Sequence, residues 1–315
     1  MLVFLCRMLE GIVYRSTGSW YSVKTDAGFL DCRIKGKIRL QGIKSTNPVA
    51  VGDRVAVDKD PKDENQGVIS DILERKNYII RRSVNLSKQT HIIAANIDQV
   101  FLLVTLNNPV TTFAFIDRFL VSAEAYGIPV ILLYNKMDAY SKEERLALEE
   151  MQAVYAAIGY ETRFISAQTQ QGVDDLKKAM GGKVSMFSGH SGVGKSTLAN
   201  AIAPDLDLKT ATISSSHSQG QHTTTFAEMF DLDADIRIID TPGIRGFGVV
   251  DMRPTELADY FLEFLPLQEG CKFHNCLHVE EPKCAIKQAV ADKHIAKSRY
   301  ESYLKLLEED TPYRK

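Results

Sequence analysis

The chain has 315 residues, of which 44% are hydrophobic and 25% are charged, as in an ordinary soluble globular protein of two or three domains. The net charge of −2 excludes a polycation, no apolar run is long enough to span a membrane, and the N-terminus lacks the pattern of a secretion signal. We therefore expect a cytoplasmic protein that does not enter a membrane.

Residues 1–82 carry 15 Lys and Arg against 10 Asp and Glu, a local excess that is a weak sign of a nucleic-acid partner and equally fits a solvated face. Within residues 8–80, short runs of alternating hydrophobicity are separated by turns rich in Gly, Asn-Pro and Asp. This pattern predicts a small β-barrel of the OB-fold type, although an SH3-like barrel has a similar pattern. The polar segment PKDENQG (61–67) is expected to form a hairpin loop.

A different pattern begins at about residue 90. Buried strands alternate with amphipathic helices, which is typical of a doubly wound α/β sheet. The expected strands are IDQVFLLVTL (97–106), IPVILLYNK (128–136), RFISA (163–167), VSMFSG (184–189) and IRIID (236–240). The expected helices are FIDRFLVSAEAYG (115–127), 141–158, VDDLKKAM (173–180) and KSTLANAIA (195–203).

After about residue 250 the sequence is mainly helical, with a group of Cys and His residues between the helices, and the tail 284–309 has helical periodicity. We therefore predict a multidomain α/β protein with three domains. These are a β-barrel at 1–82, an α/β domain at 83–248 and a helical metal-binding domain at 249–315.

The segment GHSGVGKS fits the phosphate-binding pattern G-x-x-x-x-G-K-[ST] at every fixed position, between a predicted strand and a predicted helix. Gly192 and Gly194 allow backbone N–H groups to point at phosphate oxygens, and the helix N-terminus adds a partial positive charge. Lys195 is expected to reach the β- and γ-phosphates, and Ser196 to bind Mg²⁺. A glycine-rich loop that arose by chance is the alternative.

The tetrapeptide NKMD, which begins at Asn135, follows a buried strand and fits the guanine-reading pattern N-K-x-D. The Asp138 carboxylate would accept hydrogen bonds from the ring N–H and the amino group of guanine, a pair of donors that adenine lacks. Asn135 would contact the other edge of the base, and Lys136 would pack along it. Ser166 and Ala167 end the segment RFISA, where the backbone of such a pair hydrogen-bonds the base in GTPases.

Two further motifs concern the γ-phosphate and Mg²⁺. In DTPG, Asp240 would hold Mg²⁺ through water, and the Gly243 N–H would sense the γ-phosphate. One threonine of QHTTT, Thr224, would complete the Mg²⁺ shell with Ser196, unless the segment is only a polar loop. The predicted GTP-binding residues are Asn135, Lys136, Asp138, Ser166, Ala167, Gly189, Ser191, Gly192, Val193, Gly194, Lys195, Ser196, Thr197 and Gly243.

The order of these motifs along the chain is unusual, because NKMD and the Ser-Ala pair precede the phosphate loop. A doubly wound sheet keeps its ligand groups at the carboxyl ends of its strands, whatever the order of those strands in sequence. Joining the old termini and opening one surface loop would preserve the site. We therefore predict one nucleotide site in a circularly permuted P-loop GTPase domain.

The residue after Gly243, where Ras-like enzymes carry a water-orienting Gln, is Ile244. A hydrocarbon side chain does not orient water, so intrinsic hydrolysis should be slow and another group must supply this function. His222, next to the threonines of QHTTT, is the candidate catalytic residue, unless it is a loop histidine without a role.

Three of the five cysteines lie between residues 271 and 284, in the spacing C-x4-C-x-H-x5-C. Three thiolates and one imidazole form a closed tetrahedral Zn²⁺ set of the structural kind, and the metal would fold a loop too polar to bury its own core. Unliganded cysteines are the alternative. The predicted zinc ligands are Cys271, Cys276, His278 and Cys284.

Together these residues closely resemble the RsgA (YjeQ/YloQ) family of circularly permuted GTPases. The resemblance covers nearly the whole chain and rests on the barrel-like N-terminal region, NKMD, GHSGVGKST, QHTTT, DTPGIRGFG and the Cys/His spacing. It implies an OB-fold that binds ribosomal RNA, and hydrolysis of GTP to GDP and phosphate that the small ribosomal subunit stimulates. It also implies a role late in the maturation of that subunit, a zinc domain that touches the subunit, and His222 as the catalytic residue.

Two readings of the function remain open. The first is a ribosome-assembly GTPase, and the second is a nucleotide-gated rRNA-binding module in which hydrolysis is incidental. A factor that acts on mature ribosomes is less consistent with the motif order. GTP turnover with and without small subunits separates the first two readings. We expect a monomer, because no strong apolar stripe is left over.

Overall fold

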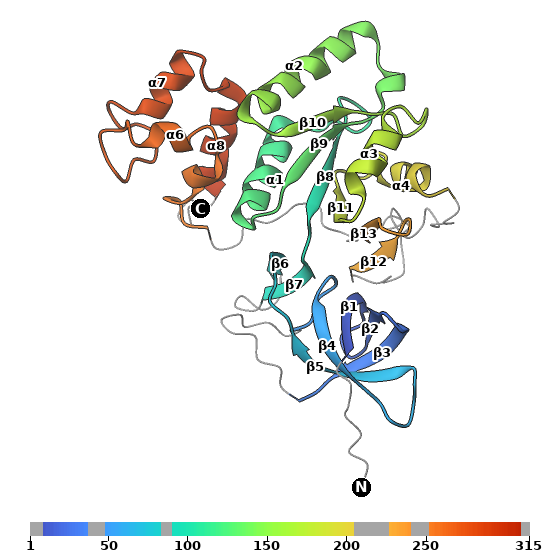
Figure 1. The fold of residues 1–315 in the computed structure, drawn as a ribbon. Coiled ribbons are helices and arrows are strands. Elements are labelled where there is room, and N and C mark those ends of the chain that lie inside the picture. The colour runs from blue at the N-terminus through green and yellow to red at the C-terminus, as the bar shows by residue number, and fades with distance from the viewer. Residues whose placement is uncertain (1–8, 37–47, 83–89, 205–226, 241–251, 310–315) are drawn as a thin grey trace, which may run out of the picture. The chain divides into compact units, whose positions relative to one another are not determined.

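The computed structural model of this protein describes residues 9–36, 48–82, 90–204, 227–240 and 252–309 (Figure 1). The chain divides into two compact units. Unit 1 comprises Met1–Phe101, Gln170–Ser188 and Lys195–Ile244. Unit 2 comprises Leu102–Thr169, Gly189–Gly194 and Arg245–Lys315.

Unit 1 begins with a closed five-stranded barrel, which confirms the barrel expected from the sequence. Its strands pair in the order β1-β2-β3-β5-β4, and β4 pairs again with β1. This closed order, in which β3 and β5 run parallel, is that of an OB-fold. The strands are β1 (Leu9–Ser16), β2 (Tyr21–Thr25), β3 (Gly28–Ile34), β4 (Arg54–Lys59) and β5 (Gln66–Ile72). Val49, from the segment before β4, joins alternating side chains of these strands in the barrel core. The core residues contributed by the strands are Val13, Tyr21, Val23, Leu30, Cys32, Val55, Val57 and Ile69.

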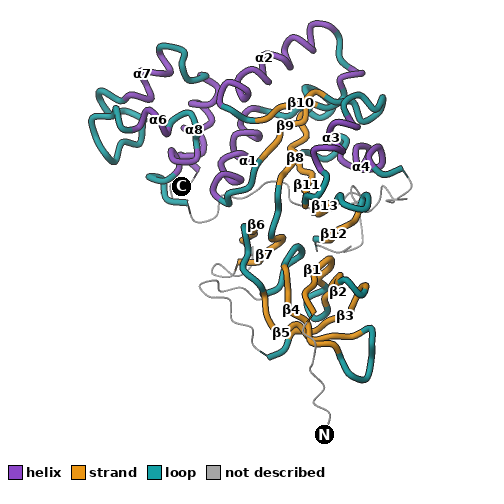
Figure 2. Tube along the Cα trace, viewed as in Figure 1, coloured by secondary structure: helices purple, strands orange, loops and turns teal. Residues whose placement is uncertain are grey.

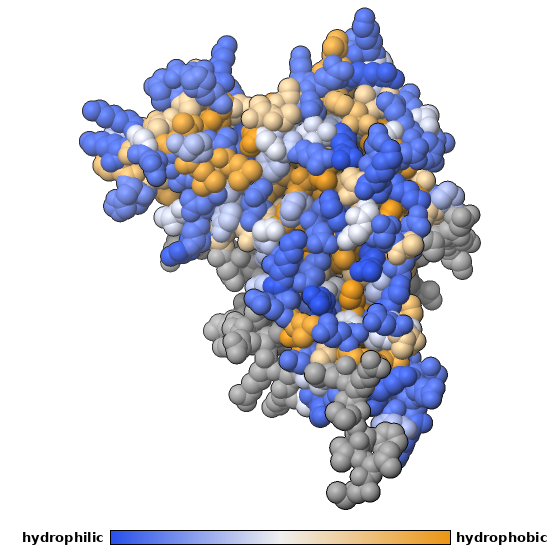
Figure 3. All heavy atoms as spheres, in the orientation of Figure 1, coloured by the Kyte–Doolittle hydropathy of each residue, from blue (hydrophilic) through white to orange (hydrophobic). Residues whose placement is uncertain are grey.

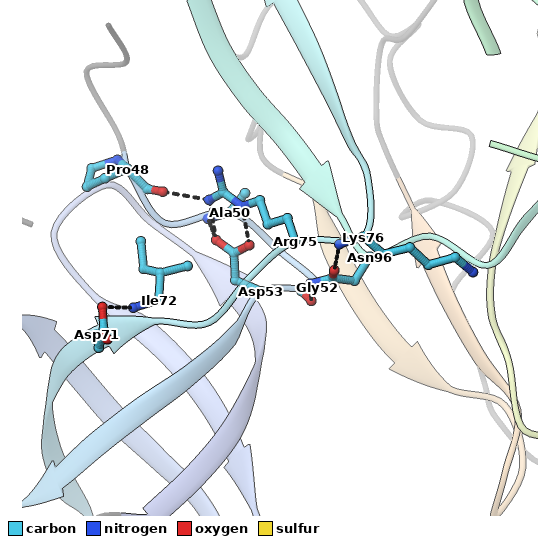
Figure 4. Close-up of polar contacts among 9 residues, drawn as sticks. All are labelled: Pro48, Ala50, Gly52, Asp53, Asp71, Ile72, Arg75, Lys76 and Asn96. Atoms are coloured by element: carbon cyan, nitrogen blue, oxygen red, sulfur yellow. Dashed lines mark hydrogen bonds and ion pairs between the residues drawn. The ribbon is translucent and has the colours of Figure 1, made fainter. Parts of the chain in front are cut away.

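A network of buried polar contacts fixes the loop before β4 to the segment that follows the barrel (Figure 4). The guanidinium of Arg75 donates two hydrogen bonds, each 2.6 Å long, to the fully buried carboxylate of Asp53. Asn96 donates to the carbonyl of Gly52 at 2.9 Å and accepts from the N–H of Lys76 at 2.9 Å. These contacts tie the barrel to the chain that enters and leaves the next hairpin.

That hairpin is a two-stranded antiparallel sheet of β6 (Tyr78–Arg82) and β7 (Thr90–Ala95), which the sequence analysis did not identify. The domain boundary expected between residues 82 and 83 falls between these two paired strands. The hairpin leads directly to the first strand of the α/β region.

The barrel sheet continues within unit 1 into three strands of the α/β region. β11 and β13 run parallel, β12 is antiparallel to β13, and β12 pairs with β1 at Arg15 and Glu228. The strands are β11 (Val184–Ser188), β12 (Glu228–Asp231) and β13 (Arg237–Asp240), and the helices are α3 (Val173–Met180) and α4 (Lys195–Ile202). The sequence analysis missed the four-residue strand β12, whereas the bounds of α3 are those predicted.

Unit 2 contains the other strands and helices of the α/β region, coloured by type in Figure 2. β9 and β10 run parallel, and all residues of β8 and β9 are buried, as their continuous apolar runs predicted. The bounds are β8 (Gln99–Val104), α1 (Phe113–Ala125), β9 (Val130–Tyr134), η1 (Met137–Ala139), α2 (Lys142–Ile158) and β10 (Glu161–Phe164). A capping box of Ser141 and Glu144 begins α2, and the surface over this helix shows both hydrophilic and hydrophobic side chains (Figure 3).

The C-terminal part of unit 2 is helical, as expected. The tail predicted to be helical from residue 284 to 309 contains two helices, because the chain turns between them and Lys293 has a left-handed backbone with φ of 61°. The elements are η2 (Leu257–Tyr260), α6 (Leu265–Gln268), α7 (Ala285–Ala291) and α8 (Lys297–Glu309). None of the helices in the described ranges is long and apolar enough to cross a bilayer.

A buried ion network holds α8 against α1. The guanidinium of Arg299, fully buried, donates to the equally buried carboxylate of Asp117 at 2.7 Å and to Glu263 at 2.7 Å. The ring of Phe261 lies 4.6 Å from the guanidinium carbon, and Tyr155 donates to Asp117 at 2.8 Å. The C-terminal helices and α1 therefore share one core.

Candidate nucleotide site and metal centre

The NKMD segment begins directly after β9, at the carboxyl end of a fully buried strand. Asn135 is buried, Lys136 has a left-handed backbone with φ of 67°, and the next three residues form the short turn η1. This turn leaves Asp138 exposed, where its carboxylate accepts a 2.5 Å hydrogen bond from the hydroxyl of Ser166. The carboxylate predicted to read guanine is therefore accessible and held in place by the Ser-Ala pair.

The amide of Asn135 joins three of the predicted motifs. Its nitrogen donates to the carbonyl of Val193 in the phosphate loop at 2.9 Å, and its oxygen accepts from the N–H of Ala167 at 3.2 Å. The contact of this side chain with the edge of the base stays a prediction. In the structure, the side chain holds the neighbouring loops together. Gly194 makes this possible: its φ is +105°, and a Cβ there would lie 2.4 Å from the Asn135 nitrogen.

Lys136 also contacts the phosphate loop. Its ammonium donates to the carbonyl of Gly192 at 2.9 Å and to the carbonyl of Asn108 at 2.5 Å. The loop that contains Asn108 follows β8, and sequence reasoning did not assign it to the site. Its position after a buried strand was the available signal, because such loops meet at the carboxyl edge of the sheet. His190 of the phosphate loop packs on Phe115 of α1, with the two ring centroids 3.9 Å apart.

Within the phosphate loop, Val193 is fully buried, whereas Ser191 and Gly192 are exposed and Gly189 is half-buried. Exposed loop backbone with a buried anchor is the arrangement that a phosphate-binding loop requires, because its N–H groups must face the ligand. Unit 2 therefore brings together Asn135, Lys136, Asp138, Ser166, Ala167, Gly189, Ser191, Gly192, Val193 and Gly194.

The remaining described residues of the predicted site lie in unit 1. Lys195 begins α4, and Ser196 and Thr197 follow it in the first turn. Burial lowers the pKa of Lys195, and the carboxylate of Asp240 at the end of β13 acts in the opposite direction. A Lys and an Asp that interact in this way, next to a helix N-terminus, form a set suited to a phosphate and its Mg²⁺.

Three predicted residues lie outside the described part of the chain. These are the catalytic candidate His222, the Mg²⁺ ligand Thr224, and Gly243 of DTPG.

The four predicted zinc ligands form one cluster in the C-terminal part of unit 2. The ligand atoms of Cys271, Cys276, His278 and Cys284 all lie within 4.8 Å of one another. The Sγ atoms of Cys271 and Cys284 are 3.9 Å apart, and His278 Nδ1 lies 3.6 Å from the first and 3.3 Å from the second. Zn–S bonds of about 2.3 Å and Zn–N bonds of about 2.0 Å at tetrahedral angles require roughly 3.8 Å and 3.5 Å. The donor set therefore fits a tetrahedral metal ion.

Hydrogen bonds from α8 and from the loop itself support this cluster. Tyr300 donates to the carbonyl of His278 at 2.6 Å, and Tyr303 donates to the carbonyl of Leu277 at 2.8 Å. The Glu281 carboxylate accepts from the backbone N–H groups of Leu277 and Val279, each at 2.8 Å. The turn that carries His278 is thus held on two sides.

The fold and the site define the class of protein. NKMD, the Ser-Ala pair and the phosphate loop meet in space but follow the permuted order in sequence, so the chain is a circularly permuted P-loop GTPase. A family model described as RsgA GTPase matches residues 72–250, and a model described as the RsgA N-terminal domain matches residues 10–69. The chain belongs to the RsgA GTPase family.

Individual relatives agree with this assignment. The protein named small ribosomal subunit biogenesis GTPase RsgA from Christiangramia forsetii is 63% identical over 97% of this chain and 98% of its own. The protein of the same name from Bacteroides fragilis is 55% identical over 96% and 97%. The crystal structure of YjeQ from Thermotoga maritima aligns with a TM-score of 0.79 at 36% identity, covering 98% of this chain and all of that one. That of YloQ, a circularly permuted GTPase, aligns with a TM-score of 0.75 at 28% identity over both full lengths.

Proposed function

We propose that this GTPase binds the small ribosomal subunit and assists a late stage of its maturation, hydrolysing GTP to GDP and phosphate with an activity that the subunit stimulates. The observation that carries the proposal is the likeness, over nearly the full length of both chains, to a relative named for small-subunit biogenesis. The exposed Asp138 beside the phosphate loop supports guanine as the base.

The roles that we propose within the nucleotide site are those expected from the sequence motifs. Asp138 reads guanine, the backbone at Ala167 contacts the base, and the N–H groups of the phosphate loop with Lys195 hold the phosphates. Mg²⁺, when bound, neutralises phosphate charge, and Ser196, Thr224 and Asp240 are the residues that would hold it. Thr197 at the start of α4 and the Gly243 N–H would complete the phosphate contacts.

His222 is the proposed catalytic residue, because Ile244 has no group that orients water. Turnover of GTP by a His222→Ala variant should fall sharply with unchanged GTP affinity, measured by single-turnover hydrolysis and by titration with a fluorescent nucleotide. Normal turnover in this variant would remove the assignment.

The Cys/His cluster is proposed to hold one structural Zn²⁺ through Cys271, Cys276, His278 and Cys284. All four positions of a tetrahedral ion are then taken by protein atoms, which leaves no site for a reacting water. The role of the ion would therefore be limited to fixing the loop.

We further propose that the molecule works as a cytoplasmic monomer with three functional parts: a barrel at 1–82 that binds ribosomal RNA, a GTPase domain at 83–248 and a zinc domain at 249–315. The excess of Lys and Arg in the first part supports an RNA partner.

GTP turnover with and without purified small ribosomal subunits tests the proposal. Large stimulation of the wild-type protein, absent from a Lys195→Ala variant, is the expected result. A matched control is Leu146→Ser, which replaces an exposed side chain on α2 and should be stimulated like the wild type. Subunit binding without stimulation would favour the alternative, a nucleotide-gated rRNA-binding module.

A further inference from the structure

A pocket of about 630 Å³ lies in unit 1 along the outer face of β1, β2 and β3 and is closed on one side by β12. Its volume is within the ~300–1,000 Å³ typical of small-molecule sites. All four residues of β12 contribute to its wall. The complete lining is Tyr14, Arg15, Thr17, Trp20, Ser22, Phe29, Asp31, Glu228, Met229, Phe230 and Asp231.

Four of the eleven residues that line this pocket carry aromatic rings: Tyr14, Trp20, Phe29 and Phe230. Phe29 is 53% exposed and stands edge-on to Tyr14, with the ring centroids 5.2 Å apart. The guanidinium of Arg33 lies over the ring of Trp20, with its carbon 4.1 Å from the ring centroid. An exposed ring, together with a second ring that carries a stacked cation, on the outer face of an OB-fold offers a platform on which flat aromatic ligands stack.

The charged residues of the lining indicate which chemical group of a flat aromatic ligand would enter the pocket. The carboxylates of Asp31, Glu228 and Asp231 disfavour a phosphate inside the pocket, because like charges repel. Asp31 and Glu228 can instead accept hydrogen bonds from the amino group of a base. The side chains of Arg15 in the pocket wall and of Arg33 over Trp20 are exposed, and they are available to a sugar–phosphate backbone outside the pocket.

The wall formed by β12 is held in place by charged hydrogen bonds. Asp231 accepts from the hydroxyl of Tyr14 at 2.7 Å and from the ammonium of Lys24 at 2.5 Å. Lys24 also lies 5.3 Å from the centroid of the Tyr14 ring. Hydrogen bonds from barrel residues therefore fix β12 beside β1, so the pocket wall consists of paired strands.

We propose that this pocket receives one unstacked nucleobase of single-stranded RNA, which stacks on Phe29 while its amino group donates to the carboxylates of the wall. This inference rests on the proposed RNA partner, and it names the part of the RNA that binds, a single base, and the pocket that receives it. A base with an exocyclic amino group, such as cytosine, is favoured over uracil, which lacks that donor.

The chain contains a single tryptophan, Trp20, so its fluorescence reports directly on this pocket. The test titrates the full-length protein with cytidylate and uridylate RNA octamers, which the guanine site does not accept. Quenching of Trp20 is expected, with tighter binding of the cytidylate octamer. Phe29→Ser should weaken binding about tenfold, because stacking of one base on an aromatic ring contributes roughly that factor.

Leu146→Ser is the matched control, since Leu146 is 54% exposed on α2 and lies outside the pocket, and it should bind as the wild type does. No quenching by either octamer, or equal affinity of the wild type and Phe29→Ser, would overturn the inference. Subunit-stimulated turnover of the same wild-type preparation reports separately on the proposed function. Stimulation without quenching would therefore refute only the pocket.

Discussion

Asn135 shows how one side chain sets the shape of the nucleotide site. Its amide connects the Ser-Ala segment to the phosphate loop, and it does so while almost completely buried. A buried amide that loses its partners leaves polar groups unsatisfied, so these bonds hold the loops in the arrangement that binds nucleotide. Asp138, in contrast, is exposed and available to the base.

This division of roles predicts different outcomes for two substitutions. Asn135→Ala removes two hydrogen bonds of about 1 kcal/mol each and should weaken GTP binding roughly thirtyfold. Because Asn135 positions loops, the loss should be the same for GTP and for xanthosine triphosphate. Asp138→Asn should instead reverse the preference, since an amide can donate to the carbonyl that xanthine carries in place of the guanine amino group.

Titration of both variants with fluorescent derivatives of the two nucleotides measures this difference. A change in base preference in Asn135→Ala would show that Asn135 reads the base itself.

At the scale of elements, α8 is fixed to α1 by ions buried in a shared core. Arg299 and Asp117 are both fully buried, and Glu263 is nearly so. Breaking such a network by removing one partner leaves an uncompensated buried charge.

Arg299→Met should therefore lower the free energy of unfolding by about 3–5 kcal/mol. The triple substitution Arg299→Met, Asp117→Asn and Glu263→Gln should recover much of the loss, because no unpaired charge remains. Chemical denaturation followed by circular dichroism measures both effects. Lys297→Ala, which alters an exposed pair on the same helix, is the control and should stay within about 0.5 kcal/mol of the wild type. A comparably small effect of Arg299→Met would contradict a structural role for the buried network.

The loop that carries the proposed zinc ligands is also held by α8, since two tyrosines of that helix donate hydrogen bonds to its backbone. Removing the metal with a chelator should unfold this loop and expose it to protease, since a polar loop has little core of its own. GTP binding should persist, because no described residue of the nucleotide site belongs to it. Limited proteolysis with mass spectrometry locates the cleavage, and an uncleaved loop after complete metal removal would exclude a structural role for the metal.

The elements that could be predicted from the sequence are those with strong local signals. Gly172 and Gly181 mark the two ends of α3. The continuous apolar runs of β8 and β9 indicate strands in the interior of a sheet, where both strands are found. In contrast, β12 has only four residues and exists through pairing with β13 and β1, a long-range condition that local periodicity does not contain. The clustering of Cys271, Cys276, His278 and Cys284 could be predicted from their spacing alone, but the loop contacts of Asn135 depend on which loops meet in space.

At the scale of the whole molecule, β12 connects two functions that the sequence places far apart. It lines the aromatic pocket of the barrel, and its residue Glu228 pairs with Asp240, the proposed Mg²⁺ residue at the end of β13. Burial and the neighbouring Asp231 raise the pKa of Tyr14 above its usual range, so the Tyr14 hydroxyl remains a donor to β12. We therefore expect a change at Asp240 to reach the pocket wall through the paired backbone of β12 and β13.

This connection predicts that RNA and nucleotide influence each other's binding. The cytidylate octamer should bind with affinities that differ by about fivefold or more between the GDP form and the form with a non-hydrolysable GTP analogue. By linkage, the octamer must change the relative affinity for the two nucleotides by the same factor. Trp20 fluorescence measures the first quantity, and competition with a fluorescent nucleotide measures the second.

Tyr14→Phe keeps the aromatic ring but removes the hydrogen bond to Asp231, so it should bind the octamer with a smaller difference between the two forms. Equal octamer affinity in both nucleotide states of the wild type would show that β12 is a passive wall.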